Sequence, residues 1–305
     1  MAIVEVRNVI KNYGVLRAVD GISLSIEEGE IFGMVGPNGA GKTTTVECIE
    51  GLRKPDGGTI SVLGLEPYKE RAKLYELIGV QLQETSYDPK IKVWEICNLF
   101  SSFYGNPLPY SKLLERFELT EKRNSYVSRL SGGQKQKLSI VLALISNPRI
   151  VFLDELTTGL DPLARRSMWE LIRGLRDEGR TVFLTTHYME EAEYLCSRVA
   201  IVDHGKIVAL GTPRSLIESS GMEERIIFEG NVPNIEELRN IKGVLDVQEN
   251  QGEVAVYGKG ADLLQNAVSY LQAKGISYKN LQTRTPNLED AFLKLTGRKY
   301  EEDRA

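Results

Sequence analysis

Cysteine, histidine and long hydrophobic runs are all scarce in this 305-residue sequence. Its three cysteines, Cys48, Cys97 and Cys196, lack the paired spacing of disulfide frameworks and zinc sites, so they indicate packed thiols in a reducing compartment. The apolar runs are far shorter than the roughly 20 residues that a membrane-spanning helix needs, and the first residues have neither the basic nor the hydrophobic region of a secretory signal. We therefore expect a cytoplasmic protein that is not itself inserted into a membrane.

An excess of positive charge is also missing. The sequence holds 38 Lys and Arg against 42 Asp and Glu, a net charge of −4, which argues against nucleic acid as a partner of the whole protein. The hydrophobic share of 42% and the charged share of 26% are typical of a soluble globular protein. The length suffices for one large domain or two ordinary ones.

The most informative feature that is present is a phosphate-binding loop, residues 36–43, which fits G-x-x-x-x-G-K-[ST] at every fixed position. An apolar strand over 31–35 is expected to enter the loop, and a helix over 44–50 to leave it with its N-terminus toward the anion. Lys42 would face the β- and γ-phosphates, and Thr43 would offer a hydroxyl to Mg²⁺. The residues predicted to bind the nucleotide here are Gly36, Asn38, Gly39, Ala40, Gly41, Lys42, Thr43 and Thr44.

Two adjacent carboxylates follow a second apolar strand, residues 150–153. In open α/β sheets ligands bind at the carboxyl ends of the strands, where Asp154 and Glu155 would lie. Asp154 is predicted to bind Mg²⁺, directly or through water, and Glu155 to act as the general base toward the attacking water. The alternative is an ordinary strand that ends in an acidic turn, and the phosphate loop makes it the weaker interpretation.

The order of the predicted elements indicates an α/β fold with a P-loop NTPase core. The first thirty residues alternate apolar and polar positions, as short antiparallel strands do, and so predict an antiparallel β subdomain. From about 74 to 145 the pattern is helical, and it gives a helical subdomain at about 84–146. Later segments are expected to form central strands (150–153, 181–185), helices between them (162–177, 189–196) and a hairpin (199–210).

The pattern changes near residue 220, so we assign 1–220 to the nucleotide-binding domain. Residues 221–297 follow the order βαββαβ and then a helix at 288–296 with Asn287 as its N-cap, which predicts a small α+β accessory domain. The charged tail, 298–305, is expected to fray. The accessory domain is interpreted as a dimer-stabilising or regulatory module. A small-molecule sensor is a more specific version of the regulatory role, although no ligand motif supports it.

A further motif, Leu-Ser-Gly-Gly-Gln at 130–134, lies between the phosphate loop and the acidic strand end. Ser131 can cap a helix from about 132 to 145, and a serine with free N–H groups at a helix start can also bind an anion. From the residues alone an ordinary N-cap explains the motif equally well. Beside the other two motifs, however, it resembles the signature of ATP-binding-cassette (ABC) ATPases, whose nucleotide-binding domain residues 1 to about 220 match throughout.

The resemblance implies further site residues. Tyr13 would stack on adenine, Gln83 would contact Mg²⁺ and the attacking water, and His187 would contact the γ-phosphate. Gln81 is a rival for the role of Gln83, a lone tyrosine is more often surface packing, and His204 is interpreted as a solvated turn residue. In this family ATP lies between two subunits. The signature residues of one subunit, here Ser131, Gly132, Gly133 and Gln134, would therefore meet the γ-phosphate bound to the other. The resemblance also implies that Asp161 contacts the opposite subunit.

The sequence departs from the family pattern at two places. Leu156 follows the catalytic glutamate where a proline is usual, which is expected to loosen the turn slightly. Lysines at 135 and 137 replace the commoner arginine pattern and keep the positive charge. Near the C-terminus, residues 285–292 resemble the closing segment of multidrug- and polysaccharide-type exporter ATPases, although packing of a terminal helix explains the same residues.

The resemblance therefore implies the ATP-hydrolysing subunit of an ABC exporter, with ATP and Mg²⁺ as cofactors. Two partners would follow: an integral-membrane permease on a separate chain, contacted beside residues 83–93, and a second cassette, most simply in a homodimer. The protein would then lie at the inner face of the cell membrane through its permease. One alternative is a soluble ABC ATPase of repair or translation, whose usual tandem cassettes or coiled-coil insertions are missing. Another is a scaffold with ATP as a structural ligand, which Glu155 and His187 disfavour.

Overall fold

The computed structural model describes residues 2–81, 87–250, 252–260 and 262–297. The chain divides into two compact units, Met1–Pro213 and Arg214–Ala305, and each is described by itself. The predicted boundary after residue 220 lies at the end of α8 (Pro213–Ser219), a helix that falls almost entirely in the second unit.

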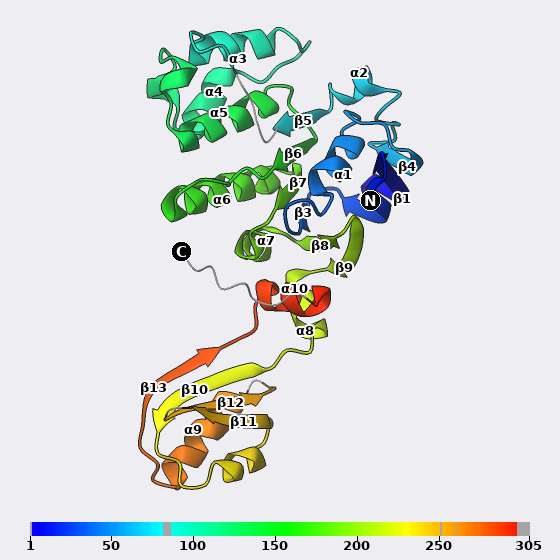
Figure 1. The fold of residues 1–305 in the computed structure, drawn as a ribbon. Helices are drawn as coiled ribbons and strands as arrows, with labels where there is room; N and C mark the ends of the chain where they lie inside the picture. The colour runs from blue at the N-terminus through cyan, green and yellow to red at the C-terminus, as the bar shows by residue number, and fades with distance from the viewer. Residues whose placement is uncertain (1, 82–86, 251, 261, 298–305) are drawn as a thin grey trace. The chain divides into compact units, whose positions relative to one another are not determined.

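A six-stranded sheet forms the core of the first unit, in the order β5-β6-β7-β3-β8-β9 (Figure 1). Strands β5 to β8 of this order run parallel, and β9 returns as an antiparallel hairpin on β8. The carboxyl ends of β3 and β6 therefore share one edge, where ligand sites of such sheets form. The strands are β3 (Ile31–Val35), β5 (Ile78–Gln81), β6 (Ile150–Asp154), β7 (Thr181–Thr186), β8 (Arg198–Asp203) and β9 (Lys206–Gly211).

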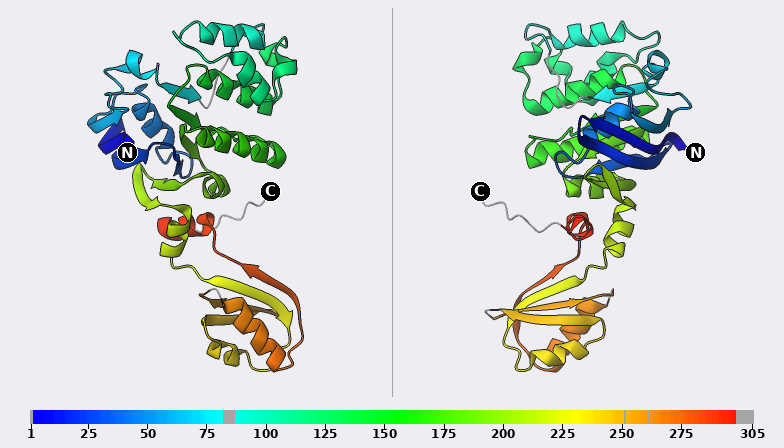
Figure 2. Two further views of the ribbon diagram at one scale, coloured as in Figure 1. Left: turned by 180° about the vertical axis from the view of Figure 1, so that it is seen from behind. Right: turned by 45° about the vertical axis from the view of Figure 1, so that its right-hand side comes forward.

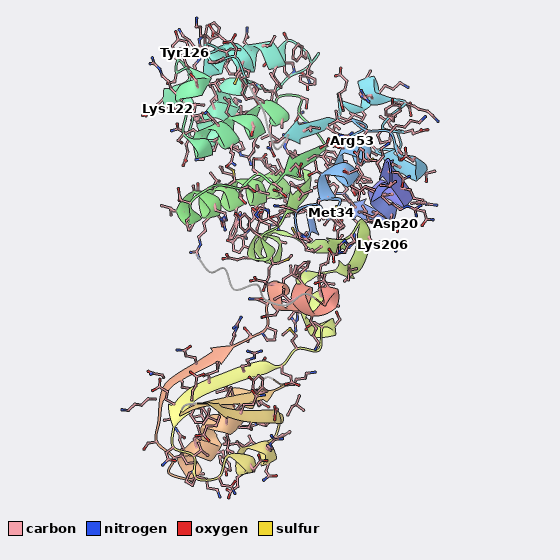
Figure 3. The ribbon with its side chains drawn as sticks, in the orientation of Figure 1. Asp20, Met34, Arg53, Lys122, Tyr126 and Lys206 are labelled. Carbon is pink, nitrogen blue, oxygen red and sulfur yellow. The ribbon has the colours of Figure 1, made fainter. Side chains whose placement is uncertain are left out.

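A three-stranded antiparallel sheet, β2-β1-β4, adjoins this core. It consists of β1 (Ala2–Tyr13), β2 (Leu16–Glu27) and β4 (Gly57–Val62). The first two strands are longer than the short strands predicted, because bulges let one continuous strand absorb the breaks in alternation. One apolar core joins both sheets and α1 (Lys42–Ile49). At its rim Asp20 and Lys206 form an ion pair of 3.2 Å between β2 and β9 (Figure 3).

The helices expected within 84–146 are α3 (Val93–Ser101), α4 (Tyr110–Arg116) and α5 (Gly132–Leu144). Short 3₁₀ turns at Thr120–Lys122 and Val127–Arg129 lie between α4 and α5, where Figure 3 labels Lys122 and Tyr126. The prediction of helix from residue 74 onward is wrong at β5, which is a strand that follows α2 (Arg71–Leu74). The four residues of β5 are too few to show the alternation of a strand. The helices predicted at 162–177 and 189–196 are α6 (Pro162–Asp177) and α7 (Met189–Leu195).

The second unit contains a four-stranded antiparallel sheet in the order β11-β12-β10-β13. The predicted βαββαβ order holds except that its first helix, Ile235–Asn240, is a 3₁₀ helix, as is common for such short segments. Helix α9 covers one face of this sheet (Figure 2), and an apolar core lies between them. Asn287 caps the terminal helix α10 (Leu288–Thr296) as predicted. The other elements are β10 (Glu224–Gly230), β11 (Val244–Asn250), β12 (Glu253–Gly258), α9 (Leu263–Ala273) and β13 (Tyr278–Arg284).

Candidate nucleotide-binding and hydrolysis site

The phosphate loop joins β3 to α1 and depends on two glycines for its path. Gly41 has a φ of 100°, and a Cβ there would lie 2.3 Å from the carbonyl oxygen of Ala18. A Cβ on Gly36 would lie 2.2 Å from the carbonyl oxygen of Val202. Among the described residues no side chain caps the start of α1, so its first N–H groups are available to bind an anion in the loop.

Lys42 extends from the start of α1 back into the loop. Its Nζ donates hydrogen bonds to the carbonyl oxygens of Gly36 (2.8 Å) and Pro37 (3.2 Å). The same Nζ lies 3.1 Å from Oε1 of Glu155, and both side chains are buried, with 4% and 7% of their surface exposed. The ammonium therefore forms a buried ion pair with the carboxylate predicted to be the general base.

Asp154 ends β6 next to the phosphate loop. Its Oδ1 accepts hydrogen bonds from the hydroxyls of Thr43, at 3.5 Å, and Thr185. Burial raises the pKa of Asp154, and the Glu155 carboxylate adds to the rise, while the two threonine hydrogen bonds oppose it. A carboxylate and a hydroxyl side by side offer the hard oxygen ligands that Mg²⁺ prefers. The residues predicted to hold the metal here, Thr43 and Asp154, thus fit the ion.

Glu155 occupies the turn after β6 in a left-handed conformation, with a φ of 47°. Its N–H donates to the Thr185 hydroxyl at 3.1 Å, which fixes the turn against β7. One carboxylate oxygen faces Lys42, and the other lies 3.4 Å from Nδ1 of His187, the residue that follows β7. Three parallel strands therefore bring together Lys42, Glu155 and His187, which are far apart in the sequence.

A cavity of about 570 Å³ opens at this point. Tyr13, which is 39% exposed, lines it, and the guanidinium carbon of Arg53 lies 5.3 Å from the centroid of the Tyr13 ring. Leu16, Ala18 and Thr158 also line the cavity, and no motif pointed to them. The predicted residues that line it are Tyr13, Asn38, Gly39, Gly41, Lys42, Thr43, Thr44, Glu155 and His187.

Other predicted site residues lie outside the lining of this cavity. Ser131 caps α5 in a reciprocal capping box: its hydroxyl accepts from the N–H of Gln134 at 3.3 Å, and its own N–H donates to the Gln134 side chain at 3.1 Å. Asp161 caps α6 by accepting from the N–H of Ala164 at 2.9 Å. Within the described parts of one chain, the structure does not bring these two caps to Lys42.

Of the two candidate glutamines, the structure describes only Gln81. Gln83 lies outside the described residues. Gln81, its rival, is 5% exposed at the end of β5, and its Oε1 accepts a hydrogen bond from the N–H of Asp154 at 3.1 Å. Gln81 therefore supports the backbone of the acidic strand end. The sequence did not reveal this role, because it depends on the parallel pairing of β5 with β6 in the sheet.

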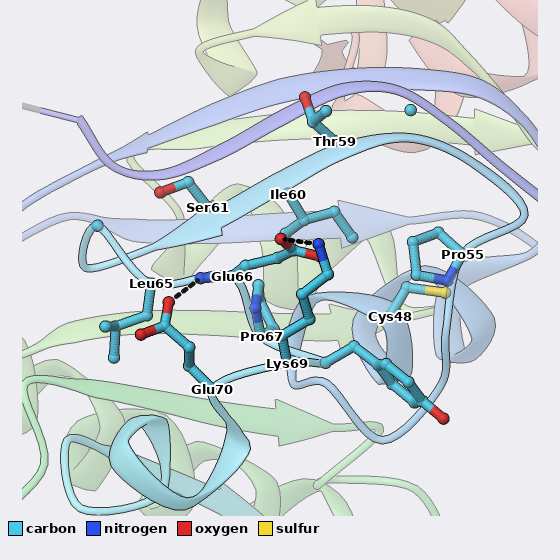
Figure 4. A pocket seen from close by; sticks show the side chains of 13 residues that line it. Cys48, Pro55, Thr59, Ile60, Ser61, Leu65, Glu66, Pro67, Lys69 and Glu70 are labelled. Carbon is cyan, nitrogen blue, oxygen red and sulfur yellow. Dashed lines mark hydrogen bonds and ion pairs between the residues drawn. The ribbon is translucent and has the colours of Figure 1, made fainter.

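A second cavity, of about 490 Å³, lies beside β4 and the segment that follows it (Figure 4). Its charged groups already satisfy one another: Lys69 pairs with Glu66 at 2.8 Å, and Glu70 accepts from the Glu66 N–H at 3.1 Å. Among the described residues that line it, none belongs to the phosphate loop. The phosphate chemistry is therefore assigned to the first cavity.

Comparison with known proteins agrees with this assignment. The family profile described as "ABC transporter" matches residues 19–158. The chain is 39% identical to the "Nod factor export ATP-binding protein I" of Burkholderia orbicola, over 99% of both chains. It is 40% identical to the protein of the same name from Rhizobium etli, over 99% of this chain and 95% of the relative.

Two solved structures show the same likeness in three dimensions. An ATP-binding subunit of an ABC transporter superimposes with a TM-score of 0.65 at 28% identity, and covers 72% of this chain and 93% of its own. A dimeric, post-hydrolysis ATP-binding cassette bound to ADP and Pi gives 0.62 at 26% identity, over 68% and 98%. No helix in the described part of the chain is long and apolar enough to cross a membrane.

Proposed function

Because the chain belongs to the ABC transporter family as one of its ATP-binding ATPases, we propose that it hydrolyses Mg-ATP between two cassettes and so powers export through a separate membrane permease. The observation that carries this proposal is the meeting of Lys42, Glu155 and His187 at one cavity beside the phosphate loop. A protein that binds ATP without hydrolysing it would need no buried carboxylate, such as Glu155, beside the lysine of its phosphate loop.

Nucleotide binding changes the partner of Lys42. The triphosphate occupies the loop, its γ-phosphate takes the place of the Glu155 carboxylate at the Lys42 ammonium, and Tyr13 stacks on the adenine. Glu155 then accepts the proton of the attacking water. His187 orients the γ-phosphate from the end of β7. Thr43 and Asp154, together with Gln83, would hold Mg²⁺, which would supply positive charge to the phosphate oxygens.

The second cassette completes the site. Ser131 and Asp161 both cap helices outside the lining of the cavity in this chain, which supports a role toward another subunit. We propose that Ser131, Gly132, Gly133 and Gln134 of one subunit contact the γ-phosphate held by the other, and that Asp161 contacts the opposite subunit. The similar solved cassette that is dimeric with ADP and Pi supports a homodimer.

Export and the permease are proposed from the relatives. The relatives named above are ATP-binding proteins of Nod factor export, and such a subunit needs a membrane partner on another chain. The protein would then lie in the cytoplasm at the inner face of the membrane. We propose 1–220 as the cassette, with the permease contact beside 83–93, and 221–297 as a module that stabilises the dimer or regulates it.

Fractionation with and without the permease tests the proposal. The protein is expressed alone or with a candidate permease, and membranes are separated from soluble material. The expected result is permease-dependent recovery in the membrane fraction, with the permease identified in the purified complex and ATP turnover altered by it. Recovery in the soluble fraction in both cases, with unchanged turnover, would favour a soluble ABC ATPase.

A further inference from the structure

Helices α6 and α7 face each other through three successive contacts. On α6 the contacting residues Arg165, Trp169 and Arg173 recur every four positions, so they share one face of the helix. They meet the side chains of Tyr188, Glu191 and Tyr194, which recur every three positions at and along α7. The two helices that follow Asp161 and His187 are thus held in register along their length.

The outer two contacts are ordinary structural ones. The indole N–H of Trp169 donates to Oε1 of Glu191 at 2.9 Å, and both residues are buried. The Trp169 ring stacks on Tyr194 with centroids 5.1 Å apart. Arg173 donates to the Tyr194 hydroxyl at 3.0 Å. These contacts fix the helix pair without reaching the nucleotide cavity.

The inner contact is different because it reaches His187. The guanidinium carbon of Arg165 lies 4.0 Å from the centroid of the Tyr188 ring, the shortest cation–ring contact in the described chain. The centroid of the Tyr188 ring in turn lies 4.1 Å from the centroid of the His187 ring. The Nε of Arg165 is buried and has no hydrogen-bond partner in the described residues, so the stacking on the Tyr188 ring is the side-chain contact that the structure shows for this guanidinium.

The other end of this contact is the cap of α6. The N–H of Arg165 donates to the carbonyl oxygen of Asp161 at 2.9 Å. This is the ordinary backbone bond of the first helical turn, so it places Arg165 one turn after the Asp161 cap, and the Arg165 side chain extends from that turn to the ring beside His187.

We propose that Arg165 is a positioning residue: through Tyr188 it ties the orientation of His187 to the turn at Asp161. This inference rests on the proposed role of His187 in hydrolysis. It requires that loss of the Arg165–Tyr188 contact slow turnover while leaving ATP binding nearly unchanged, since neither residue lines the cavity.

The chain offers matched controls. Arg165→Met removes the inner cation–ring contact, and Arg173→Met removes the equivalent contact to Tyr194 at the outer end. Arg166→Met changes the exposed neighbour of Arg165. We expect Arg165→Met to lower kcat by about threefold to thirtyfold, the range that one cation–ring contact supplies, with KM for ATP within twofold. The two control variants should keep the kcat of the parent, whatever their melting temperature.

Tyr188 provides a second, independent test if Arg165→Met folds poorly. Tyr188→Phe keeps the ring and should retain parental kcat, whereas Tyr188→Leu should lose as much as Arg165→Met. The double variant Arg165→Met/Tyr188→Leu should lose no more than either single one. Equal effects of Arg165→Met and Arg173→Met, or additive losses in the double variant, would overturn the inference. His187→Ala is measured alongside: full turnover in that variant would instead refute the proposed role of the histidine.

Discussion

Replacing Glu155 with glutamine tests the centre of the site with the smallest change of shape. The glutamine keeps the size of the side chain and a hydrogen-bonding oxygen, but it cannot accept a proton from water. It also cancels the negative charge that lies 3.1 Å from Lys42 and 3.4 Å from His187. Two measurable quantities, turnover and nucleotide affinity, should therefore move in opposite directions.

Turnover should fall because the general base is lost. A positioned base contributes about 10²-fold to 10⁴-fold to a rate, which corresponds to about 2.7 to 5.4 kcal/mol of activation free energy. We expect Glu155→Gln to hydrolyse ATP at least about 10²-fold more slowly than the parent. With binding intact, the variant should accumulate as an ATP-bound dimer.

Affinity should rise because ATP competes with Glu155 for Lys42. A hydrogen bond to a charged group contributes about 1.5–3 kcal/mol and a neutral one about 0.5–1.5 kcal/mol. The neutral glutamine therefore weakens the contact that ATP must replace by about 1 to 1.5 kcal/mol. This difference corresponds to an ATP affinity about fivefold to thirteenfold higher in the variant.

Calorimetric titration with ATP at low temperature gives the affinity, phosphate release gives the turnover, and size-exclusion chromatography gives the dimer. Glu178→Gln, an exposed change at the far end of α6, serves as the control for the loss of one charge. Hydrolysis at the parental rate would show that another group activates the water. An affinity equal to or lower than that of the parent would refute the exchange of partners at Lys42.

Three further predictions follow from the same geometry. Lys42→Ala should weaken ATP binding itself, and unchanged affinity in calorimetry would contradict the loop assignment. A mixture of Ser131→Arg and Lys42→Ala subunits should recover activity that neither homodimer has, because one of its two shared sites is intact; heterodimers without activity would rule out sharing. Burial raises the pKa of Cys48 to about 11 and of Cys97 to about 12, and Cys196 is buried as well. Since the thiolate is the reactive form, all three should resist alkylation at pH 7 in the native protein and react after unfolding; rapid native labelling would contradict the packing.

The phosphate loop and the acidic strand end could be predicted because the residues that define them are adjacent in the sequence. A glycine pattern, a lysine and a preceding apolar strand are local signals, and so is a serine or asparagine at a helix start, as the caps at Ser131 and Asn287 show. The helix over 162–177 likewise has its cap and its period within one segment.

The contacts between segments could not be predicted in this way. The ion pair between Lys42 and Glu155, and the hydroxyl of Thr185 against Asp154, join residues that only the sheet order brings together. Strand β5 was assigned to a helical stretch because four residues carry no clear period. The 3₁₀ helix at Ile235–Asn240 has a helical composition, but it is too short to settle into an α-helix.

The turn after β6 has Leu156 directly after Glu155, the proposed general base, at the position where the family resemblance led us to expect a proline. A proline at 156 would favour extended backbone at Glu155, whereas Glu155 adopts a φ of 47°. Its N–H donates to both the carbonyl and the hydroxyl oxygen of Thr185, at 3.2 and 3.1 Å, and its own carbonyl accepts from Thr158 at 3.2 Å. Leu156 is 4% exposed and adds apolar burial to these hydrogen bonds. The turn that aims the glutamate at Lys42 is therefore held by its neighbours in the sheet and by a buried leucine, so the backbone at this position does not depend on a fixed ring.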